Sequence, residues 1–414
     1  MGLSDSAHDQ FLCSRIWARD KCPASADPVW KGERYRHERI RVAYLSADFH
    51  EHVMAYRLAG LFEAHDRRRF EITGVSFGPD VPNRMRERLK RAFDRFIDVR
   101  LSDDRQVARL LRELEIDIAV DLNGFTTGGR TRIFASRAAP VQASYLGYPG
   151  SMGADYIDYI LADRCVIPEQ HFPCYTEKVV FLPETYQVND SKRVISGRMP
   201  TRAEAGLPER GFVFCSFNNS YKISPMVFDA WMRLLGKVEG SLLWLVDSSA
   251  TAVRNLRNEA AARGIAPDRL VFAPKIGHED YLARHRLADL ALDTLPYNGH
   301  GTTSDALWAG LPVLTCLGNA MPGRVAASVL TAVGLPELVT CSLEEYEALA
   351  TSLVQEPARL QRIRDKLASN RLTYPLFDTE RFTRHLEAAF EQMWRMHGQG
   401  EAPRHFSVTP LNSQ

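Results

Sequence analysis

Residues 292–305 read Leu-Asp-Thr-Leu-Pro-Tyr-Asn-Gly-His-Gly-Thr-Thr-Ser-Asp, an apolar strand-like run that passes through a glycine- and hydroxyl-rich turn into a helical pattern. Free backbone N–H groups and hydroxyls at the start of a helix suit a pyrophosphate. Asp305, expected within the first helical turn, is placed to accept hydrogen bonds from ribose hydroxyls. The alternative is an ordinary helix start capped by Thr303 or Ser304. The turn lacks both G-x-G-x-x-G and a P-loop lysine, so phosphate binding and simple capping both stay open.

The alternation of strand and helix extends through the second half of the chain. Apolar runs typical of buried strands occur at Phe212–Phe217, Leu242–Val246, Leu270–Phe272, Leu290–Leu292 and Val313–Thr315. Helical patterns follow at Met226–Leu235, Val253–Arg263, Asp305–Ala309, Val325–Val333, Glu344–Asn370 and Thr379–Met396. Such alternation predicts a parallel sheet with right-handed crossovers.

The first half shows the same pattern, which predicts a second domain of the same kind. Strands are expected at Ile40–Leu45, Phe70–Ser76, Ile118–Leu122, Gln142–Leu146 and Tyr159–Leu161, with helices at Val53–His65 and Gln106–Leu114. A polar, aperiodic stretch, Pro183–Arg210, is interpreted as the linker. We therefore expect an α/β protein of two doubly wound, Rossmann-like domains facing a central cleft at the carboxyl ends of their strands.

The domain boundaries follow from these patterns. We expect a helical extension over residues 1–37, a first domain over 38–190, a second over 191–375, a final helix over 376–398 and a disordered tail over 399–414. The final helix carries an apolar stripe that includes Phe382, Leu386 and Phe390. A stripe of this kind needs a partner surface, and we expect that surface on the first domain.

Composition narrows the class of function. The chain has 414 residues and a net charge of +1, so bulk electrostatics favour neither nucleic acid nor an anionic membrane as a partner. No run approaches the roughly 18 apolar residues of a membrane span, and the polar first nine residues do not resemble a signal peptide. The seven cysteines form no C-x-x-C pair, which indicates a reduced, cytoplasmic protein.

Two segments after predicted strands carry groups suited to catalysis. Lys222 follows Phe217-Asn218-Asn219, and a lysine just past a strand end can neutralise charge on a leaving diphosphate, although a solvated loop lysine is the plainer interpretation. His52 is the last residue of Asp48-Phe49-His50-Glu51-His52, and the pKa range of histidine suits a general base. A weak metal site or a helix cap are the alternatives. No D-x-D motif occurs, so we expect no metal and no cofactor.

At these segments the chain resembles the catalytic region of the O-linked N-acetylglucosamine (O-GlcNAc) transferase family, in its bacterial form without a tetratricopeptide array. The resemblance runs from about Arg41 to Trp394 and rests on motifs that occur in one order. They are Ala47-Asp48-Phe49 with His52, Asp121-Leu122-Asn123-Gly124-Phe125-Thr126, Leu146-Gly147-Tyr148-Pro149-Gly150, Phe217-Asn218-Asn219 with Tyr221-Lys222, Leu287-Ala288-Asp289, Asn298-Gly299-His300 with Asp305-Ala306-Leu307-Trp308-Ala309-Gly310, and Arg324-Val325-Ala326-Ala327-Ser328.

The resemblance implies a GT-B fold, inversion at the sugar C1 and UDP-N-acetylglucosamine as donor, with the first domain on the acceptor side. It implies His52 as base or acceptor contact and Lys222 as the lysine on the diphosphate. It also implies a donor site formed by Leu146, Gly147, Asn219, His278, Tyr281, Arg284, His300, Gly301, Thr302, Thr303 and Asp305. Tyr281 and Arg284 match the positions that flank the uracil.

Departures from the family bear on the acceptor more than on the fold. Gly301 replaces a threonine of the phosphate site, His278 replaces a lysine, and Asp117 stands where animal members carry an acceptor-side histidine. Only about forty residues precede the catalytic pattern, too few for a repeat array. The leading hypothesis is transfer to Ser/Thr hydroxyls of protein. A glycan, lipid-linked or small-molecule acceptor, or a weakly active UDP-sugar-binding module, are the alternatives.

Overall fold

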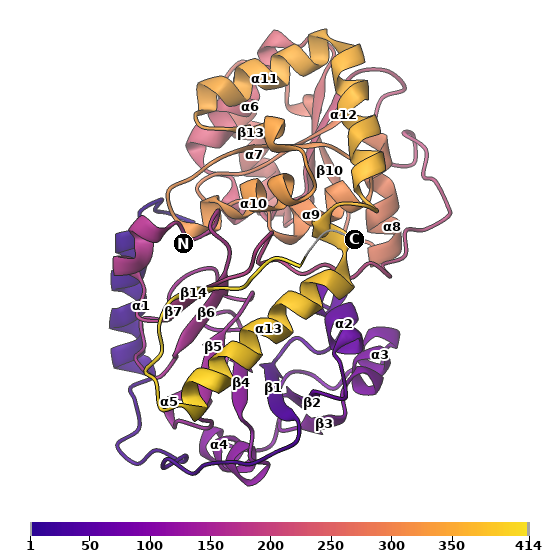
Figure 1. Ribbon diagram of the computed structural model, residues 1–414. Coiled ribbons are helices and arrows are strands. Elements are labelled where there is room, and N and C mark those ends of the chain that lie inside the picture. The colour runs from indigo at the N-terminus through magenta and orange to yellow at the C-terminus, as the bar shows by residue number, and fades with distance from the viewer. Residues whose placement is uncertain (1, 412–414) are drawn as a thin grey trace. The chain divides into compact units, whose positions relative to one another are not determined.

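The computed structural model describes residues 2–411, which form two compact units (Figure 1). The N-terminal unit comprises residues 6–192 and 375–411, and the C-terminal unit comprises residues 2–5 and 193–374. Each unit is built on one parallel sheet with flanking helices, so the predicted α/β class with two doubly wound domains is confirmed. No helix of the described chain is long and apolar enough to span a membrane.

The sheet of the N-terminal unit has the strand order β14-β7-β6-β5-β4-β1-β2-β3. Its strands are β1 Ile40–Ser46, β2 Phe70–Ser76, β3 Arg95–Asp98, β4 Ile118–Asp121, β5 Val141–Ser144, β6 Tyr159–Ala162, β7 Lys178–Phe181 and β14 Phe406–Ser407. The helices are α1 Ala7–Lys21, α2 Ala55–Ala64, α3 Arg84–Ala92, α4 Asp104–Glu113, α5 Arg132–Ala135 and α13 Thr379–Gly398, with 3-10 turns η1 Glu169–Cys174 and η7 Pro375–Phe377. β4 and β5 are buried along their whole length, as expected of central parallel strands.

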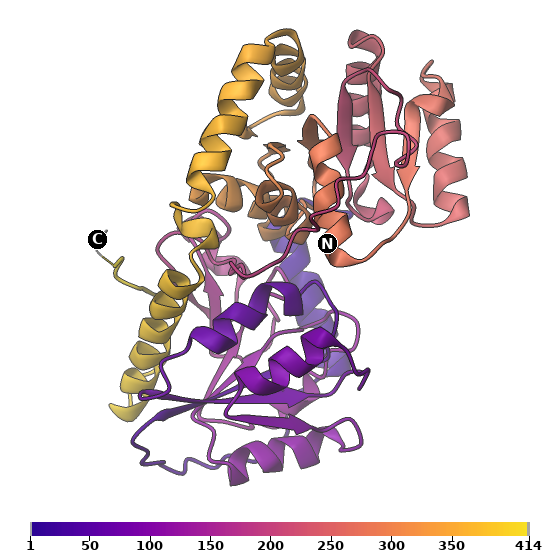
Figure 2. The same ribbon diagram turned by 90° about the vertical axis from the view of Figure 1, so that its right-hand side faces the viewer.

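The sheet of the C-terminal unit has the order β10-β9-β8-β11-β12-β13, and helices lie on both of its faces (Figure 2). Its strands are β8 Val213–Ser216, β9 Leu242–Val246, β10 Leu270–Ala273, β11 Leu290–Leu292, β12 Val313–Cys316 and β13 Val339–Thr340. The helices are α6 Pro225–Lys237, α7 Ala250–Ala262, α8 His278–Arg284, α9 Gly301–Trp308, α10 Val325–Ala332, α11 Leu343–Gln355 and α12 Pro357–Asn370. Short 3-10 turns are η2 Ser220–Lys222, η3 Pro267–Arg269, η4 His285–Leu287, η5 Met321–Gly323 and η6 Pro336–Leu338.

In both sheets the order of strands reverses between two neighbours. From β1 the chain first moves outward to β2 and β3 and then returns to β4 on the other side of β1. From β8 it moves to β9 and β10 and then returns to β11. Ligands of open α/β sheets bind beyond the carboxyl ends of the strands at this reversal, so the loops after β1, β4, β8 and β11 are the places to look.

Several local predictions were wrong. The helical pattern Glu344–Asn370 is two helices, α11 and α12, because Pro357 starts a new helix and ends the preceding one at Gln355. The tail expected to be disordered contains β14, which pairs with β7 at the sheet edge. The polar stretch taken as a linker is partly a buried segment, since Tyr186, Val188 and Asp190 are almost inaccessible to solvent.

Helix α13 packs within the N-terminal unit, against α2 and β5, and lies along the sheet in both views (Figures 1 and 2). Its apolar stripe is buried, and the fully buried Glu387 binds the end of α2. The Glu387 carboxylate accepts hydrogen bonds from His65 Nδ1 at 3.1 Å and from the Asp66 backbone N–H at 2.7 Å. His65 Nε2 in turn contacts the Tyr44 hydroxyl at 2.9 Å, which connects α13 to the central strand β1.

Candidate functional site

The loop after β11 is organised by a buried carboxylate. Asp293 accepts hydrogen bonds from the Gly299 backbone N–H and from the Thr315 hydroxyl, both at 2.6 Å. Its backbone carbonyl accepts from the Tyr346 hydroxyl at 3.1 Å. Burial raises the pKa of Asp293 to about 6, against these hydrogen bonds and the nearby Lys222 charge, which lower it. The loop that precedes α9 is therefore folded back onto the end of its own strand.

Lys222 joins the loop after β8 to the loop after β11. Its Nζ donates to the Asn298 carbonyl oxygen at 2.7 Å and lies 3.9 Å from the centroid of the Tyr297 ring. Asn298 is fully buried, and its side-chain amide donates to the Thr294 carbonyl at 2.7 Å. The two strongest sequence signals of this unit are thus brought together at the reversal point of the sheet.

Helix α9 begins earlier than predicted, at Gly301, and it has no side-chain cap. The alternative of a cap by Thr303 or Ser304 is wrong, because both residues lie inside the helix, where Thr303 donates to the Gly299 carbonyl at 2.8 Å and Ser304 to the His300 carbonyl at 3.4 Å. A Cβ at Gly299 would come within 2.5 Å of the Thr302 hydroxyl, so only glycine fits there. The side chain of His300, the residue before α9, accepts no hydrogen bond from the first N–H groups of the helix.

Asp305 lies in the second turn of α9, not in the first as predicted. Its buried carboxylate accepts a hydrogen bond from Arg193 Nη1 at 2.7 Å. The Arg193 guanidinium packs over the Trp308 ring, and the Trp308 indole N–H donates to the Arg193 carbonyl at 3.2 Å. Asp305 therefore has an ion-pair partner that the sequence analysis did not foresee.

An aromatic cluster stands beside α9. Tyr281 stacks on His278 with centroids 6.0 Å apart, and Arg284 lies over both the Tyr281 and Phe217 rings. His285 packs edge-on against Tyr281 at 4.8 Å, and burial lowers its pKa to about 4, so this ring is neutral near pH 7. Burial also lowers the pKa of Arg284, which is 5% exposed.

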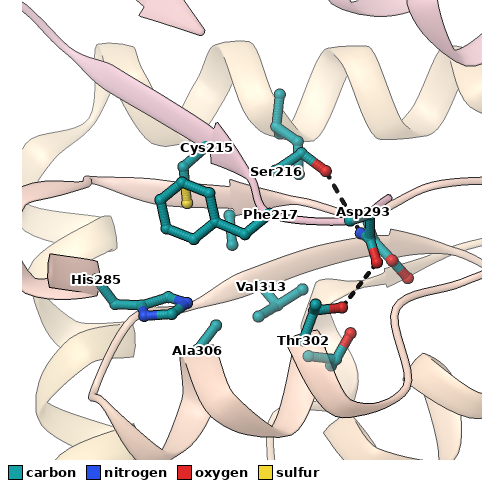
Figure 3. Close-up of a pocket in the computed structure, with 12 residues that line it drawn as sticks. Cys215, Ser216, Phe217, His285, Asp293, Thr302, Ala306 and Val313 are labelled. Carbon is teal, nitrogen blue, oxygen red and sulfur yellow. Dashed lines mark hydrogen bonds between the residues drawn. The ribbon is translucent and has the colours of Figure 1, made fainter. Parts of the chain in front are cut away.

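A pocket opens between this cluster and the start of α9 (Figure 3). Its walls come from β8, β11, β12 and α9, and the lining residues are Cys215, Ser216, Phe217, Asn218, His285, Ala291, Leu292, Asp293, Thr302, Thr303, Ala306 and Val313. The Asn218 side chain donates from Nδ2 to the Ser216 hydroxyl at 3.4 Å and accepts at Oδ1 from the Thr302 hydroxyl at 2.7 Å. Among the predicted donor residues, Thr302 and Thr303 line this pocket, whereas Asn219 is exposed outside it. Asn218, two residues after β8, was part of a quoted motif but was not among the predicted donor residues.

The corresponding loops of the N-terminal unit hold His52. Asn123, after β4, donates from Nδ2 to Asp48 Oδ2 at 2.8 Å, and its Oδ1 accepts from the Ala47 backbone N–H at 2.8 Å. The other carboxylate oxygen of Asp48 lies 3.5 Å from His52 Nδ1, and the Met54 backbone N lies 3.3 Å from the same ring nitrogen. Burial lowers the pKa of His52 against the opposing effect of Asp48, so the ring is neutral near pH 7.

Leu146 and Gly147 follow β5 at the same edge of the sheet. Leu146 has a positive φ of 68°, which is uncommon for a residue with a side chain. A Cβ at Gly147 would come within 2.0 Å of the Leu122 carbonyl oxygen, so this close approach requires glycine. The loop that follows is held by the buried Glu177, whose carboxylate accepts from the Ser151 hydroxyl at 2.6 Å and the Met152 backbone N–H at 2.5 Å.

Asp117 is not at this edge, which corrects the prediction of an acceptor-side role. It precedes β4 and therefore lies at the amino end of the strands, opposite to His52. Its fully buried carboxylate accepts from the Arg41 backbone N–H at 2.8 Å. Burial raises the pKa of Asp117 to about 7. These contacts give Asp117 a structural place between the starts of β1 and β4.

Comparisons with known proteins agree with this geometry. The profile of glycosyl transferase family 41 matches residues 29–199 and 196–386. A probable UDP-N-acetylglucosamine–peptide N-acetylglucosaminyltransferase of Arabidopsis thaliana, SEC, is 36% identical over 409 residues, which cover 97% of this chain and 42% of the relative. A Caenorhabditis elegans UDP-N-acetylglucosamine–peptide N-acetylglucosaminyltransferase is 26% identical over 88% of this chain and 41% of its own. The chain thus spans about two fifths of the length of these curated relatives.

Solved structures are also similar to this chain. A mutant O-GlcNAc transferase of Thermobaculum terrenum is 32% identical with a TM-score of 0.85, over 95% of this chain and 75% of that one. Anabaena HepE, 12% identical with a TM-score of 0.57 over 86% of this chain and 100% of that one, is similar in fold alone.

Proposed function

The chain belongs to glycosyl transferase family 41, and from this premise we propose that it transfers N-acetylglucosamine from UDP-N-acetylglucosamine to Ser/Thr hydroxyls of protein. The observation that carries the proposal is the contact of Lys222 with the loop before α9. It puts a fixed cation beside an uncapped helix start, at the reversal point of the sheet. Both groups suit an anion, and two of them together suit a diphosphate.

The donor is proposed to bind in the C-terminal unit. Lys222 and the first N–H groups of α9, from Gly301 to Thr303, would hold the diphosphate. The flat Tyr281 ring, with Arg284 beside it, would flank the uracil. Asp305 is proposed to act through Arg193, its observed partner, because that ion pair fixes the second turn of α9. His278 extends the stacked rings outward from Tyr281.

Charge stabilisation at this site is proposed to be metal-independent. The negative charge that develops on the UDP leaving group would be met by the Lys222 ammonium and the dipole of α9. Displacement of UDP by an acceptor hydroxyl in one step inverts the configuration at C1. The new glycosidic bond forms as the C1–oxygen bond to the phosphate breaks, and the hydroxyl proton passes to a base.

His52 is proposed to receive that proton or to orient the hydroxyl. A neutral imidazole has one protonated nitrogen, and base activity at Nε2 requires the proton to sit on Nδ1. The Asp48 carboxylate, fixed by Asn123, lies 3.5 Å from Nδ1 and favours that tautomer, whereas the Met54 N–H, 3.3 Å from Nδ1, favours the other. The first tautomer gives a base, and the second gives a donor to the acceptor oxygen.

The proposal is tested by incubating purified protein with isotopically labelled UDP-N-acetylglucosamine and a cell lysate, followed by mass spectrometry of peptides. Labelled N-acetylglucosamine on Ser or Thr, absent with a Lys222→Ala variant, supports it. Label on glycan, lipid or small molecules instead would assign a different acceptor. Binding of UDP with no transfer or donor hydrolysis would identify a sugar-nucleotide-binding module and defeat the proposed reaction.

A further inference from the structure

The first described residues of the chain lie in the C-terminal unit, although the helix that follows them, α1, belongs to the N-terminal unit. Asp5 makes the contact. Its two carboxylate oxygens both lie 2.9 Å from the Asn319 backbone N, and they also accept from Asn319 Nδ2 at 2.9 Å and the Ala320 backbone N–H at 3.2 Å. One carboxylate thus organises the loop after β12, which we call the 318–323 loop.

The 318–323 loop is closed around this carboxylate. Gly318 N–H donates to the Gly323 carbonyl at 2.7 Å, and the Arg324 guanidinium donates to the Gly318 carbonyl at 2.9 Å. A Cβ at Gly318 would come within 2.8 Å of Asp5 Oδ1 and 3.0 Å of the Gly323 Cα. The loop therefore leaves room for Asp5 only because position 318 has no side chain.

The same loop reaches the candidate donor site through one carbonyl. The Pro322 oxygen accepts from the Asn298 backbone N–H at 2.9 Å and lies 3.1 Å from His300 Nε2. Because a carbonyl only accepts, His300 carries its proton on Nε2, which leaves Nδ1 as an acceptor in the neutral ring. The carbonyl of Asn298 is the group that holds Lys222.

A second contact connects residues 2–5 to the segment that carries Lys222. The position of a Cβ on Gly2 lies 3.7 Å from the Tyr221 carbonyl oxygen, next to Lys222. The Tyr221 ring packs edge-on against Tyr297 at 6.3 Å, and Tyr297 packs against His300 at 5.0 Å. Residues 2–5 therefore lie against the backbone next to Lys222 and against the 318–323 loop, whose Pro322 carbonyl accepts from Asn298.

We infer that Asp5 is a positioning residue of the donor site. It holds the 318–323 loop so that Pro322 fixes the tautomer of His300 and the backbone of Asn298, and Asn298 in turn holds Lys222. The inference rests on the proposed function for its kinetic readout. Its structural step, from Asp5 to Asn298, does not depend on that function.

The test compares Asp5→Ala and Asp5→Asn with Asp20→Asn, a control that removes an exposed charge from α1 outside the loop. Asp5→Ala should raise KM for UDP-N-acetylglucosamine and Kd for UDP on the order of tenfold or more, because small displacements of positioning groups cost that much. Asp5→Asn keeps one acceptor oxygen, so its KM and Kd should lie between those of Asp5→Ala and those of the wild type. Asp20→Asn should match the wild type.

Hydrogen exchange supplies the readout that needs no ligand. In Asp5→Ala the amides of residues 298–303 and 319–323 should exchange faster than in Asp20→Asn, while amides of β8 and β9 stay unchanged. Wild-type exchange at Asn298 in Asp5→Ala would overturn the inference, whatever the protein binds. Faster exchange with unchanged UDP affinity would also overturn it, by reducing Asp5 to a local anchor. A wild-type protein that binds UDP but transfers no sugar would refute the proposed function alone.

Discussion

Replacing Lys222 with alanine removes a charge that connects the loops after β8 and β11. In the structure the ammonium is half-buried, donates to the Asn298 carbonyl at 2.7 Å and lies over the Tyr297 ring. Its position is therefore fixed before any donor arrives. A preorganised cation of this kind stabilises charge that develops on a leaving group without the cost of reorienting water.

The magnitude follows from the half-buried setting. At an effective dielectric constant of about 20, two unit charges roughly 4 Å apart interact by about 4 kcal/mol. If the transition state loses this interaction energy, kcat decreases by about 10³-fold. The fold should lose less, because one charge-assisted hydrogen bond contributes about 1.5–3 kcal/mol and the Asn298 carbonyl can take a water in its place.

The assay is single-turnover transfer from radiolabelled UDP-N-acetylglucosamine, with thermal unfolding measured on the same samples. Lys366→Ala is the matched control, because Lys366 belongs to the same unit and pairs only with the side chain of Glu337 among the residues described here. Lys222→Arg keeps the charge and should retain more activity than Lys222→Ala. Turnover by Lys222→Ala within tenfold of the wild type would refute the assignment of Lys222 to the diphosphate.

Three further outcomes are expected. His52→Ala should lower kcat with little change in UDP affinity, and kcat/KM of the wild type should fall in acid below the ordinary histidine pKa, because burial lowers the pKa of His52 and only its neutral ring accepts a proton; equal losses in UDP binding and turnover would argue against this role. Transfer should persist in excess EDTA; loss that manganese or magnesium restores would contradict metal independence. Glu387→Ala should cost about 3 kcal/mol in urea unfolding by leaving His65 Nδ1 and the Asp66 N–H without their acceptor, whereas the exposed Glu391→Ala should cost little.

Strands were the part of the fold that the sequence predicted best. β9 and β11 begin and end where their apolar runs do. A strand buried on both faces is apolar at every position, so the ends of the apolar run mark the ends of the strand. Strand β14 could not be found this way, since it has two residues and exists only through its pairing with β7. The break between α11 and α12 was readable in principle, because Pro357 is typical of a first helical position.

For the site, position in the strand was a better guide than residue type. Asp117 stands where animal members of the family carry an acceptor-side histidine, yet it precedes its strand and so lies at the amino edge. Asn123 and Asn218 follow their strands and reach the carboxyl edge, where both bind catalytic candidates or their neighbours. The partner of Asp305 could not be predicted, because Arg193 stands 112 residues away in an aperiodic segment.

In both units a buried asparagine holds two loops together at the point where the strand order reverses. In each, a buried asparagine after a central strand uses its amide to tie one loop to another: Asn123 joins the β4 loop to Asp48, and Asn298 joins the β11 loop to α10 through its contact with the Ala326 backbone N–H. An amide both donates and accepts, so one side chain can fix two loops that approach from neighbouring strands. The two side chains proposed for catalysis are then held by these amides or their backbone: His52 through Asp48, and Lys222 through the Asn298 carbonyl. The loops can therefore differ from the family pattern, as at Gly301, while the groups proposed to meet the substrate keep their places.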